Sequence, residues 1–334
     1  MNILLFLKNL QGRGVSKVYL NLAKGFHRYG HSVTIVIREN IIDFQTDTEV
    51  IVFTKDITKN VDKLIKDKKI DFIISNNVKY LEGIKNIDSN KILYTIHMLW
   101  GSRVIKQLRF KKWLELKREY KNKYIIVDSN AVKDDLLNKI KIKPKKIQVI
   151  PDIFDYEEIY KKSKEYKPQY KNYLLHIGAF SKEKNHKLLL KTYAKLNCKY
   201  ELVLIGNGKL FNDIKKLAKK LKIDNKVHFL GFVKNPYPYI KNAKLLIMTS
   251  DNEGLPGVAI ESMLLNTPVV STDSIGIRDI LIDEFKEFIT NKEELADKIK
   301  SALNYYPKID TDKFKKRFSF EIIKEYERIF NELQ

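Results

Sequence analysis

Short apolar runs recur along the whole chain, and between them apolar residues return every three or four positions. The runs that predict buried strands lie at 3–7, 33–37, 72–75, 92–96, 124–127, 147–151, 173–177, 202–205, 227–230, 243–248 and 267–271. After the first run, a glycine loop is followed by apolar residues at helical spacing up to Phe26, and Gly30 ends the predicted helix. Strand, glycine loop, helix and strand in this order are typical of a Rossmann-like unit, so the pattern predicts an α/β fold.

The pattern divides into two parts of similar size. A segment rich in Lys, Tyr and Glu at 156–171 separates the strands of the first part from those of the second, and we interpret it as an interdomain linker. The residues at 314–333 are apolar at helical spacing and predict a C-terminal helix. A chain of 334 residues is long enough for two domains of ordinary size.

One stretch carries the strongest sign of a binding site. The strand predicted at 243–248 is followed by a loop with Glu253, and a helix is predicted to begin at Pro256 and Gly257. A helix that opens directly after a strand presents unpaired backbone N–H groups, which bind anions well. Glu261 lies about one turn inside this helix. Two carboxylates that flank a phosphate pocket suit a bound diphosphate with sugar hydroxyls on either side, which indicates a nucleotide-sugar site.

The same stretch resembles a known family. Glu253 and Glu261 form a Glu-x7-Glu motif, and the string around it continues to Pro-Val-Val-Ser-Thr-Asp at 268–273. This string resembles the retaining family 4 glycosyltransferases of GT-B fold, also called group 1 glycosyl transferases. The resemblance implies two Rossmann-like domains that face a central cleft. It implies an acceptor-side domain at 1–165, a nucleotide-sugar donor domain at 170–312, and a C-terminal helix at 314–334 that packs back on the first domain.

The resemblance also implies roles for individual residues. Lys184, in the loop at 178–185, is expected to hold the donor diphosphate, Glu253 a hydroxyl of the donor sugar, and Glu261 the ribose hydroxyls. His97, at the end of the strand 92–96, is expected near the donor sugar, so the predicted catalytic residues are His97, Lys184 and Glu253. The predicted donor-binding residues are Gly14, Arg13, Lys184, Gly206, Phe232, Val233, Glu253, Gly254, Leu255, Pro256, Gly257 and Glu261.

Some positions depart from the family's pattern. Ala179 stands where many members have an arginine, and Arg13 and Lys182 are the candidates to supply that charge. Arg13-Gly14 replaces a pair of glycines, and an equal alternative is that Arg13 is an ordinary surface residue. Asp152 follows Pro151 where the family commonly has an asparagine.

Composition narrows the class of protein. Hydrophobic residues make up 44% and charged residues 31% of the chain, as in a globular domain. The single cysteine, Cys198, leaves neither a disulfide framework nor a thiolate cluster for zinc, which fits a reducing cytoplasm. Residues 1–7 predict a strand and not a signal peptide, and no apolar run is long enough to span a membrane. We therefore expect a cytoplasmic protein.

The charge adds a candidate partner. The net charge is +22, and residues 1–170 hold 34 basic and 20 acidic side chains, a net +14. Residues 101–123 contain nine basic and two acidic side chains interleaved with aromatic and aliphatic ones, a pattern typical of helices on anionic membrane surfaces. Two alternatives remain open: a solvated helix whose apolar stripe is core, and a lysine-rich background composition. The membrane interpretation predicts peripheral attachment at the inner face of the cell membrane.

The prediction for function is a retaining glycosyltransferase that uses a nucleotide-diphosphate sugar, with a UDP-sugar expected, and a glycan or lipid-linked acceptor. No cofactor and no metal are expected, because no Asp-x-Asp motif lies on a suitable loop. The first alternative is an NAD-dependent oxidoreductase, which Gly12, Gly14 and Glu39 would suit, although Lys17 stands where the third glycine belongs. The second, a nucleic-acid-binding protein, depends on charge alone, and no nucleic-acid partner is expected.

Overall fold

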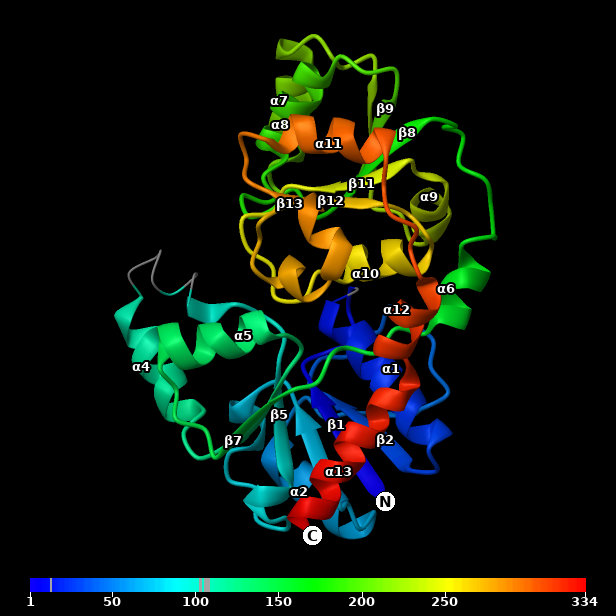
Figure 1. The fold of residues 1–334 in the computed structure, drawn as a ribbon. Helices are drawn as coiled ribbons and strands as arrows, with labels where there is room; N and C mark the ends of the chain where they lie inside the picture. The colour runs from blue at the N-terminus through cyan, green and yellow to red at the C-terminus, as the bar shows by residue number, and fades with distance from the viewer. Residues whose placement is uncertain (13, 102–103, 105–108) are drawn as a thin grey trace. The chain divides into compact units, whose positions relative to one another are not determined.

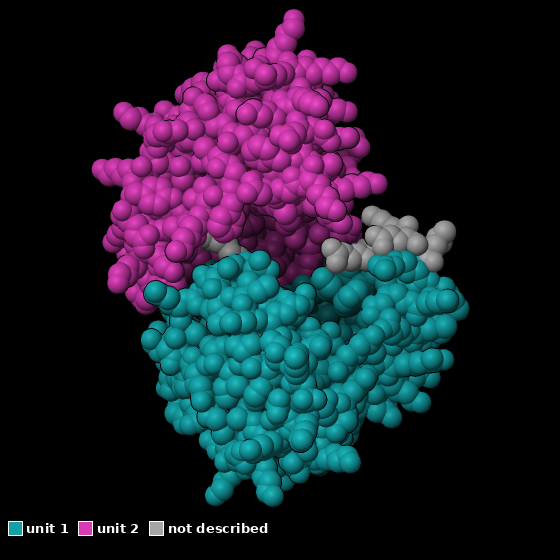
Figure 2. All heavy atoms as spheres, turned by 180° about the vertical axis from the view of Figure 1, so that it is seen from behind, with its two compact units in different colours: residues 1–155, 317–334 teal, residues 156–316 magenta. Residues whose placement is uncertain are grey.

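The computed structural model describes residues 1–334 except 13, 102–103 and 105–108. The chain forms two compact units, shown in different colours in Figure 2. Unit 1 consists of Met1–Asp155 and Arg317–Gln334, and unit 2 of Tyr156–Lys316. Each unit has a sheet with helices on its faces (Figure 1). Among the described residues, no helix combines the length and the apolar character that a membrane span requires.

Unit 1 contains a seven-stranded sheet in the order β3-β2-β1-β4-β5-β6-β7, and every neighbouring pair is parallel. The central strands consist almost wholly of buried Ile, Leu, Val and Phe, as a parallel sheet covered on both faces requires. The strands are β1 (Asn2–Leu7), β2 (Ser32–Ile37), β3 (Glu49–Val52), β4 (Phe72–Ser75), β5 (Ile92–Ile96), β6 (Tyr124–Val127) and β7 (Lys146–Val149).

The longer helices of unit 1 are amphipathic and pack their apolar side chains against the rest of the unit. In the helix after β3, for example, Val61, Leu64 and Ile65 are buried at helical spacing. The helical segments are α1 (Gly14–Arg28), α2 (Ile57–Asp67), η1 (Val78–Leu81), η2 (Ser89–Lys91), α4 (Phe110–Glu119), α5 (Asn130–Asp134), η3 (Asp135–Ile140), η6 (Phe320–Ile322) and α13 (Ile323–Leu333).

Unit 2 contains a six-stranded parallel sheet in the order β10-β9-β8-β11-β12-β13. Its strands are β8 (Tyr173–Ile177), β9 (Glu201–Ile205), β10 (Val227–Gly231), β11 (Leu245–Met248), β12 (Val269–Thr272) and β13 (Ile289–Thr290). Its helical segments are α6 (Tyr156–Lys162), α7 (His186–Leu196), α8 (Phe211–Lys220), α9 (Tyr237–Asn242), α10 (Gly257–Leu264), η4 (Gly276–Asp279), η5 (Asp283–Phe288), α11 (Leu295–Asn304) and α12 (Thr311–Arg317), which ends in unit 1.

Each sheet has one point at which the strand order reverses. In unit 1 this point lies between β1 and β4, and in unit 2 between β8 and β11. Ligands of open α/β sheets bind beyond the carboxyl ends of the strands at such a point, because the loops on either side diverge there. The loops after β8 and β11 are the ones that carry Lys184 and Glu253.

The end of the chain is part of the core of unit 1. Phe330 of α13 stacks on Phe72 of β4 with 4.2 Å between ring centroids, and Tyr326 meets Phe26 of α1 edge-on at 5.6 Å. Gly25 of α1 makes room for this helix, since a Cβ atom there would lie 2.8 Å from the Ile323 side chain. The tail therefore closes the apolar face that α1 and the central strands would otherwise expose.

The structure corrects the predicted elements in three places. The tail is not one helix from 314 to 333: it breaks after Arg317, and the Ser319 hydroxyl accepts the Glu321 N–H at the start of the next turn. Strands β3 and β13 and helix α2 were not predicted; β3 is short and only half-buried, and β13 has two residues. The predicted linker at 156–171 begins with a helix, α6.

Candidate functional site

Unit 2 brings Lys184 and Glu253 into contact. Lys184 belongs to the loop between β8 and α7, and Glu253 to the loop between β11 and α10. The Lys184 ammonium group donates a hydrogen bond to the Glu253 carboxylate, and the two side chains are 25% and 14% exposed. The sequence pattern predicted both residues for the site, 69 positions apart in the chain. The pairing holds a half-buried cation at the carboxyl edge of the sheet.

Hydrogen bonds between the two loops fix the positions of these side chains. The Asp251 N–H donates to the Glu183 carbonyl at 2.8 Å, and the Thr249 hydroxyl donates to the Lys184 carbonyl at 2.9 Å. The Asn185 amide also donates to Asp251, at 3.3 Å. The backbone on both sides of Lys184 is thus held by the loop that carries Glu253, which gives the site the rigid support that binding geometry needs.

Two glycines permit close contacts between the loops. A Cβ atom at Gly276 would lie 1.8 Å from the Gly254 carbonyl oxygen, so only glycine allows the loop after β12 to touch the loop that carries Glu253. Gly206, which follows β9, has φ +141°, and a Cβ atom there would lie 2.0 Å from the Gly178 carbonyl oxygen. Gly206 was predicted to bind the donor. The positive φ and the close contact with Gly178 are sufficient to explain why this position is a glycine.

The helix predicted after Glu253 is present. α10 begins at Gly257 and Pro256 occupies the position before it, without a side-chain cap for the first turn. The Ala259 N–H donates to the Pro256 carbonyl at 3.0 Å, and the N–H groups of this turn carry the positive end of the helix dipole. Gly254 and Leu255 form the rest of the loop between Glu253 and the helix. The site combines this dipole with the ammonium group of Lys184.

Glu261 lies one turn inside α10 and has a partner that the sequence analysis missed. The hydroxyl group of Tyr237, a residue of α9 that is only 4% exposed, donates to Oε1 of Glu261 at 3.0 Å. On the same edge of the sheet, Phe232 and Val233 follow β10, and the Phe232 side chain is 61% exposed. A tyrosine in a short helix carries no motif, so only the structure associates Tyr237 with the site.

Two buried histidines lie under the Lys184 loop and were also missed. Nδ1 of His176 lies 2.8 Å from the Ile247 carbonyl oxygen, which can only accept, so Nδ1 carries the proton. The His176 ring meets His186 edge-on at 4.6 Å, and His186 stacks on Phe180 at 4.0 Å. Burial lowers the pKa of His176 to about 4 and that of His186 to about 2. Both rings are therefore neutral at pH 7 and pack without adding charge next to Lys184.

His97 of unit 1 lies between two carboxylates. It follows β5, while Asp128 follows β6 and Asp152 comes shortly after β7. Its Nδ1 atom lies 3.2 Å from Oδ1 of Asp152 and 3.5 Å from Oδ2 of Asp128, and all three side chains are at most 13% exposed. Burial alone would lower the pKa of His97, but Asp152 and Asp128 together raise it to about 10. Burial raises the pKa of Asp128.

These three side chains are also a group that could hold a metal ion, since one ligand atom from each lies within 4.8 Å of the others. Both carboxylates face the same ring nitrogen, and a proton on that nitrogen suits both of them. We interpret the group as an ion pair. The sequence predicts a site role for His97 but for neither carboxylate, because Asp152 is distinguished in sequence only as a residue where the family commonly has an asparagine.

The glycine loop of unit 1 is described only in part, because Arg13 lies outside the described residues. α1 begins at Gly14, and a Cβ atom at Gly14 would meet no atom within 4 Å. The fold therefore does not require glycine at that position. Lys182 is exposed in the loop before Lys184, and Ala179 lies between β8 and that loop. Within unit 2, no hydrogen bond or ion pair between the described residues joins Lys182 to the Lys184–Glu253 pair.

The basic segment predicted as a helix at 101–123 is described only in part. α4 spans Phe110–Glu119, and residues 102–103 and 105–108 lie outside the described residues. The apolar side of α4 faces unit 1: Leu116 is 1% exposed, and the Trp113 indole N–H donates to the Lys139 carbonyl at 3.3 Å. Phe110 is the exception, with 66% of its side chain exposed. Within α4, Leu116 thus belongs to the core, Trp113 and Leu114 are partly buried, and Phe110 is exposed, so both alternatives for the segment remain open.

Comparisons with known proteins give the family. A model described as "Glycosyltransferase Family 4" matches residues 12–158, and one described as "Glycosyl transferases group 1" matches residues 157–318. The two models between them cover both units apart from the ends of the chain. The chain therefore belongs to the group 1 and family 4 glycosyltransferases, as the Glu-x7-Glu motif predicted.

Individual relatives agree with this. The chain is 29% identical over 308 residues to an uncharacterized glycosyltransferase of Methanocaldococcus jannaschii, across 87% of this chain and 70% of that one. It is 34% identical over 161 residues to the N-acetylgalactosamine-N,N'-diacetylbacillosaminyl-diphospho-undecaprenol 4-alpha-N-acetylgalactosaminyltransferase of Campylobacter jejuni, across 48% of this chain and 44% of that one. The alternatives of an oxidoreductase and a nucleic-acid-binding protein are set aside, because the family accounts for the whole pattern.

A solved structure with the same fold is that of HepE from Anabaena in complex with UDP and glucose. It superposes with a TM-score of 0.78 at 17% identity and covers 99% of this chain and 100% of that one. At this identity the similarity concerns the fold, which is GT-B, the two-domain α/β architecture that the sequence predicted.

Proposed function

We propose that the chain is a retaining, metal-independent glycosyltransferase that moves a sugar from a UDP-sugar to a glycan acceptor carried on a lipid. The observation that carries the proposal is the pairing of Lys184 with Glu253 at the start of α10, with Glu261 one turn further. Unit 2 would be the donor domain and unit 1 the acceptor-side domain. HepE was crystallised with UDP and glucose, and the Campylobacter relative is named for a diphospho-undecaprenol substrate; both support this choice of donor and acceptor.

The chemistry follows from where charge develops in sugar transfer. The bond between the anomeric carbon and the diphosphate oxygen breaks, and negative charge grows on the diphosphate while the sugar becomes cation-like. Lys184 and the first N–H groups of α10 would stabilise that negative charge. Glu253 would bind a hydroxyl of the sugar and Glu261 the ribose hydroxyls. The departing phosphate oxygen would take the proton of the acceptor hydroxyl as the new bond forms on the same face, which retains the configuration without an enzymatic nucleophile.

His97 keeps a proposed role near the donor sugar. Its imidazole ring is held by Asp128 and Asp152 and carries a proton at neutral pH, so it would act as a hydrogen-bond donor and a fixed positive charge. Gly14, Arg13, Phe232 and Val233 remain proposed donor-binding positions.

The test is the thermal stability of the protein in the presence of UDP, GDP, ADP or NAD. A ligand at a hundred times its dissociation constant stabilises a protein by about 2.7 kcal/mol, which is readily measured as a rise in Tm. We expect UDP to raise the Tm of the wild-type protein and to do so less for Glu261→Ala. A response to NAD alone would contradict the proposal, and a response to GDP or ADP would change the base but keep the reaction.

Attachment to an anionic membrane is a second part of the proposal. It is favoured by the basic face of α4, where Lys111, Lys117 and Arg118 are found, and by the exposed ring of Phe110. The experiment is cosedimentation with vesicles that contain an anionic lipid. We expect binding that weakens as salt is added and that falls in Phe110→Ser. Equal recovery with neutral vesicles would exclude a role for lipid charge, and no recovery with either would contradict attachment to a membrane.

A further inference from the structure

Tyr237 and Glu261 form a contact that the sequence motif did not predict. The Tyr237 hydroxyl group donates to one oxygen of the Glu261 carboxylate at 3.0 Å, and Tyr237 is 4% exposed. A buried phenol has little freedom to move, because its ring is packed on all sides. The hydrogen bond therefore restrains the position of Oε1 and limits the rotation of the Glu261 carboxylate.

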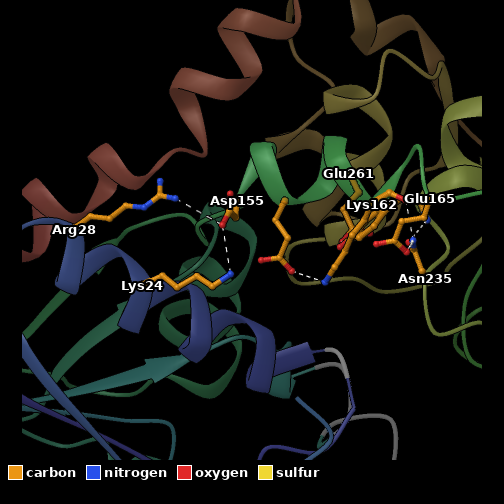
Figure 3. A network of polar contacts seen from close by, with 9 residues as sticks. Lys24, Arg28, Asp155, Lys162, Glu165, Asn235 and Glu261 are labelled. Atoms are coloured by element: carbon orange, nitrogen blue, oxygen red, sulfur yellow. Dashed lines mark hydrogen bonds and ion pairs between the residues drawn. The ribbon is translucent and has the colours of Figure 1, made fainter. Parts of the chain in front are cut away.

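Tyr237 is also held through its backbone. Its backbone N–H donates to the side-chain oxygen of Asn235 at 3.1 Å. The side-chain amide of Asn235 donates to the Lys162 carbonyl at 2.8 Å and to Oε2 of Glu165 at 2.7 Å. Figure 3 shows Lys162, Glu165, Asn235 and Glu261 together as sticks within unit 2. A continuous series of hydrogen bonds thus runs from the end of α6 through Asn235 and Tyr237 to Glu261.

We propose that Tyr237 is the positioning residue of Glu261 and that Asn235 anchors it, so that this pair sets how strongly the site selects a ribonucleotide over a deoxyribonucleotide. The proposal rests on the proposed function, in which Glu261 binds the ribose hydroxyls. Two hydroxyls on adjacent ring carbons can both donate to one carboxylate only when the carboxylate plane is suitably oriented. A ligand with a single hydroxyl makes no such demand, so a loosely held Glu261 would lose selectivity before it loses binding.

The experiment compares the dissociation constants of UDP and 2′-deoxy-UDP for each variant by calorimetry. The quantity to compare is the dissociation constant of 2′-deoxy-UDP divided by that of UDP. Partial unfolding of a variant weakens the binding of both ligands equally and leaves this ratio unchanged. We expect Tyr237→Phe, which removes only the hydroxyl group, to lower the ratio by about tenfold, equivalent to about 1.4 kcal/mol. Glu261→Gln should bring the ratio close to one. Tyr239→Phe is the matched control, since it removes a hydroxyl group from the same short helix, and it should leave the ratio unchanged.

A double-mutant cycle tests the anchor. If Asn235 acts through Tyr237, the ratio for Asn235→Ala falls, and the double variant with Tyr237→Phe falls no further than the lower of the two single variants. Additive losses would overturn the anchoring role. An unchanged ratio in Tyr237→Phe would overturn the whole inference. If the wild-type protein binds UDP without discrimination, the inference fails while the donor site stands, and if it binds no uridine nucleotide, the proposed donor fails first.

Discussion

The ammonium group of Lys184 donates to the carboxylate of Glu253, and the two residues come from loops that follow the adjacent strands β8 and β11. Both side chains are mostly shielded from water, so the attraction between the two charges offsets the loss of hydration of each. A diphosphate that binds Lys184 must therefore compete with Glu253 for the same ammonium group. This competition gives the two residues opposite effects on nucleotide affinity.

Lys184→Gln should reduce both the affinity for UDP and the rate of sugar transfer. The substitution removes the positive charge proposed to face the diphosphate, and the loss of one such donor typically costs about 100-fold to 1,000-fold in kcat. The measurement is initial rate and UDP affinity on the same preparation. Lys187→Gln, three residues along and exposed, is the control and should change neither. A variant Lys184→Gln with unchanged kcat would remove Lys184 from the proposed mechanism.

Glu253→Gln should separate nucleotide binding from transfer. The variant keeps the shape of the side chain but frees Lys184 from its carboxylate partner and removes a negative charge near the diphosphate. We expect UDP to bind at least as tightly as to the wild-type protein, while turnover of the nucleotide sugar falls because the sugar hydroxyl loses a charged acceptor. Calorimetry with UDP and a kinetic assay give the two numbers. Parallel losses in both would indicate that Glu253 acts on the fold of the loop alone.

Gly276→Ala should destabilise unit 2 and disable the donor site. Its new Cβ atom would lie 1.8 Å from the Gly254 carbonyl oxygen, so the loop that carries Glu253 must move. Overpacking of this kind costs about 1–3 kcal/mol. The free energy of unfolding in urea and the affinity for UDP measure the two effects.

Gly14→Ala is the contrasting variant, because a Cβ atom there meets no atom within 4 Å. It should leave stability unchanged or raise it by about 0.5–1 kcal/mol, since alanine suits a helix better than glycine. If Gly14 lies close to the donor phosphates, as proposed, transfer should still slow down. Full activity in a stable Gly14→Ala protein would exclude Gly14 from the donor site.

The His97 ion pair predicts a pH dependence of stability. The pKa of His97 is about 10 in the folded protein against 6.5 for a free histidine. The folded state therefore holds the proton more tightly, and the stabilisation is complete below about pH 6.5 and is lost as the pH rises through about 10. Asp152→Asn should lower this pKa and cost about 2 kcal/mol at pH 6.5, with a difference from wild type that shrinks towards pH 10.

Urea unfolding at several pH values measures this difference, and the proton NMR titration of His97 measures its pKa directly. Asp47→Asn removes an exposed carboxylate of the same unit and should give no pH-dependent difference. A His97 that titrates near its ordinary pKa in the wild-type protein would contradict the ion pair.

Elements with a strong local pattern were predicted best. The bounds of β4, β5, β6 and β8 agree with the apolar runs residue by residue, because strands buried on both faces are continuous apolar runs. β3 lies at the edge of its sheet and is only half-buried, so its pattern is weak. The break in the tail at Ser319 depends on one side-chain hydrogen bond, which apolar spacing does not reveal.

The residues of the candidate site were likewise predicted best where they belong to a local sequence pattern. Glu253, Glu261 and Lys184 belong to strings of residues with a recognisable spacing, and the contact between Lys184 and Glu253 agrees with a shared site. Tyr237 is associated with Glu261 in unit 2, and Asp128 and Asp152 with His97 in unit 1, only through tertiary contacts between segments far apart in the chain. A polar residue whose partner is distant in sequence leaves no periodic trace, which is why the supporting residues were missed.

Unit 1 is assembled from the two ends of the chain, and unit 2 from one uninterrupted stretch between them. On the ribosome, residues 1–155 emerge before unit 2, but the rings of Phe26 and Phe72 lack their partners Tyr326 and Phe330 until these are made. At about 5–20 residues per second, the intervening stretch takes roughly 10–30 s to synthesise. Unit 1 is thus begun before unit 2 and completed after it, and we expect nascent chains to expose an aromatic surface to chaperones and proteases for that whole interval.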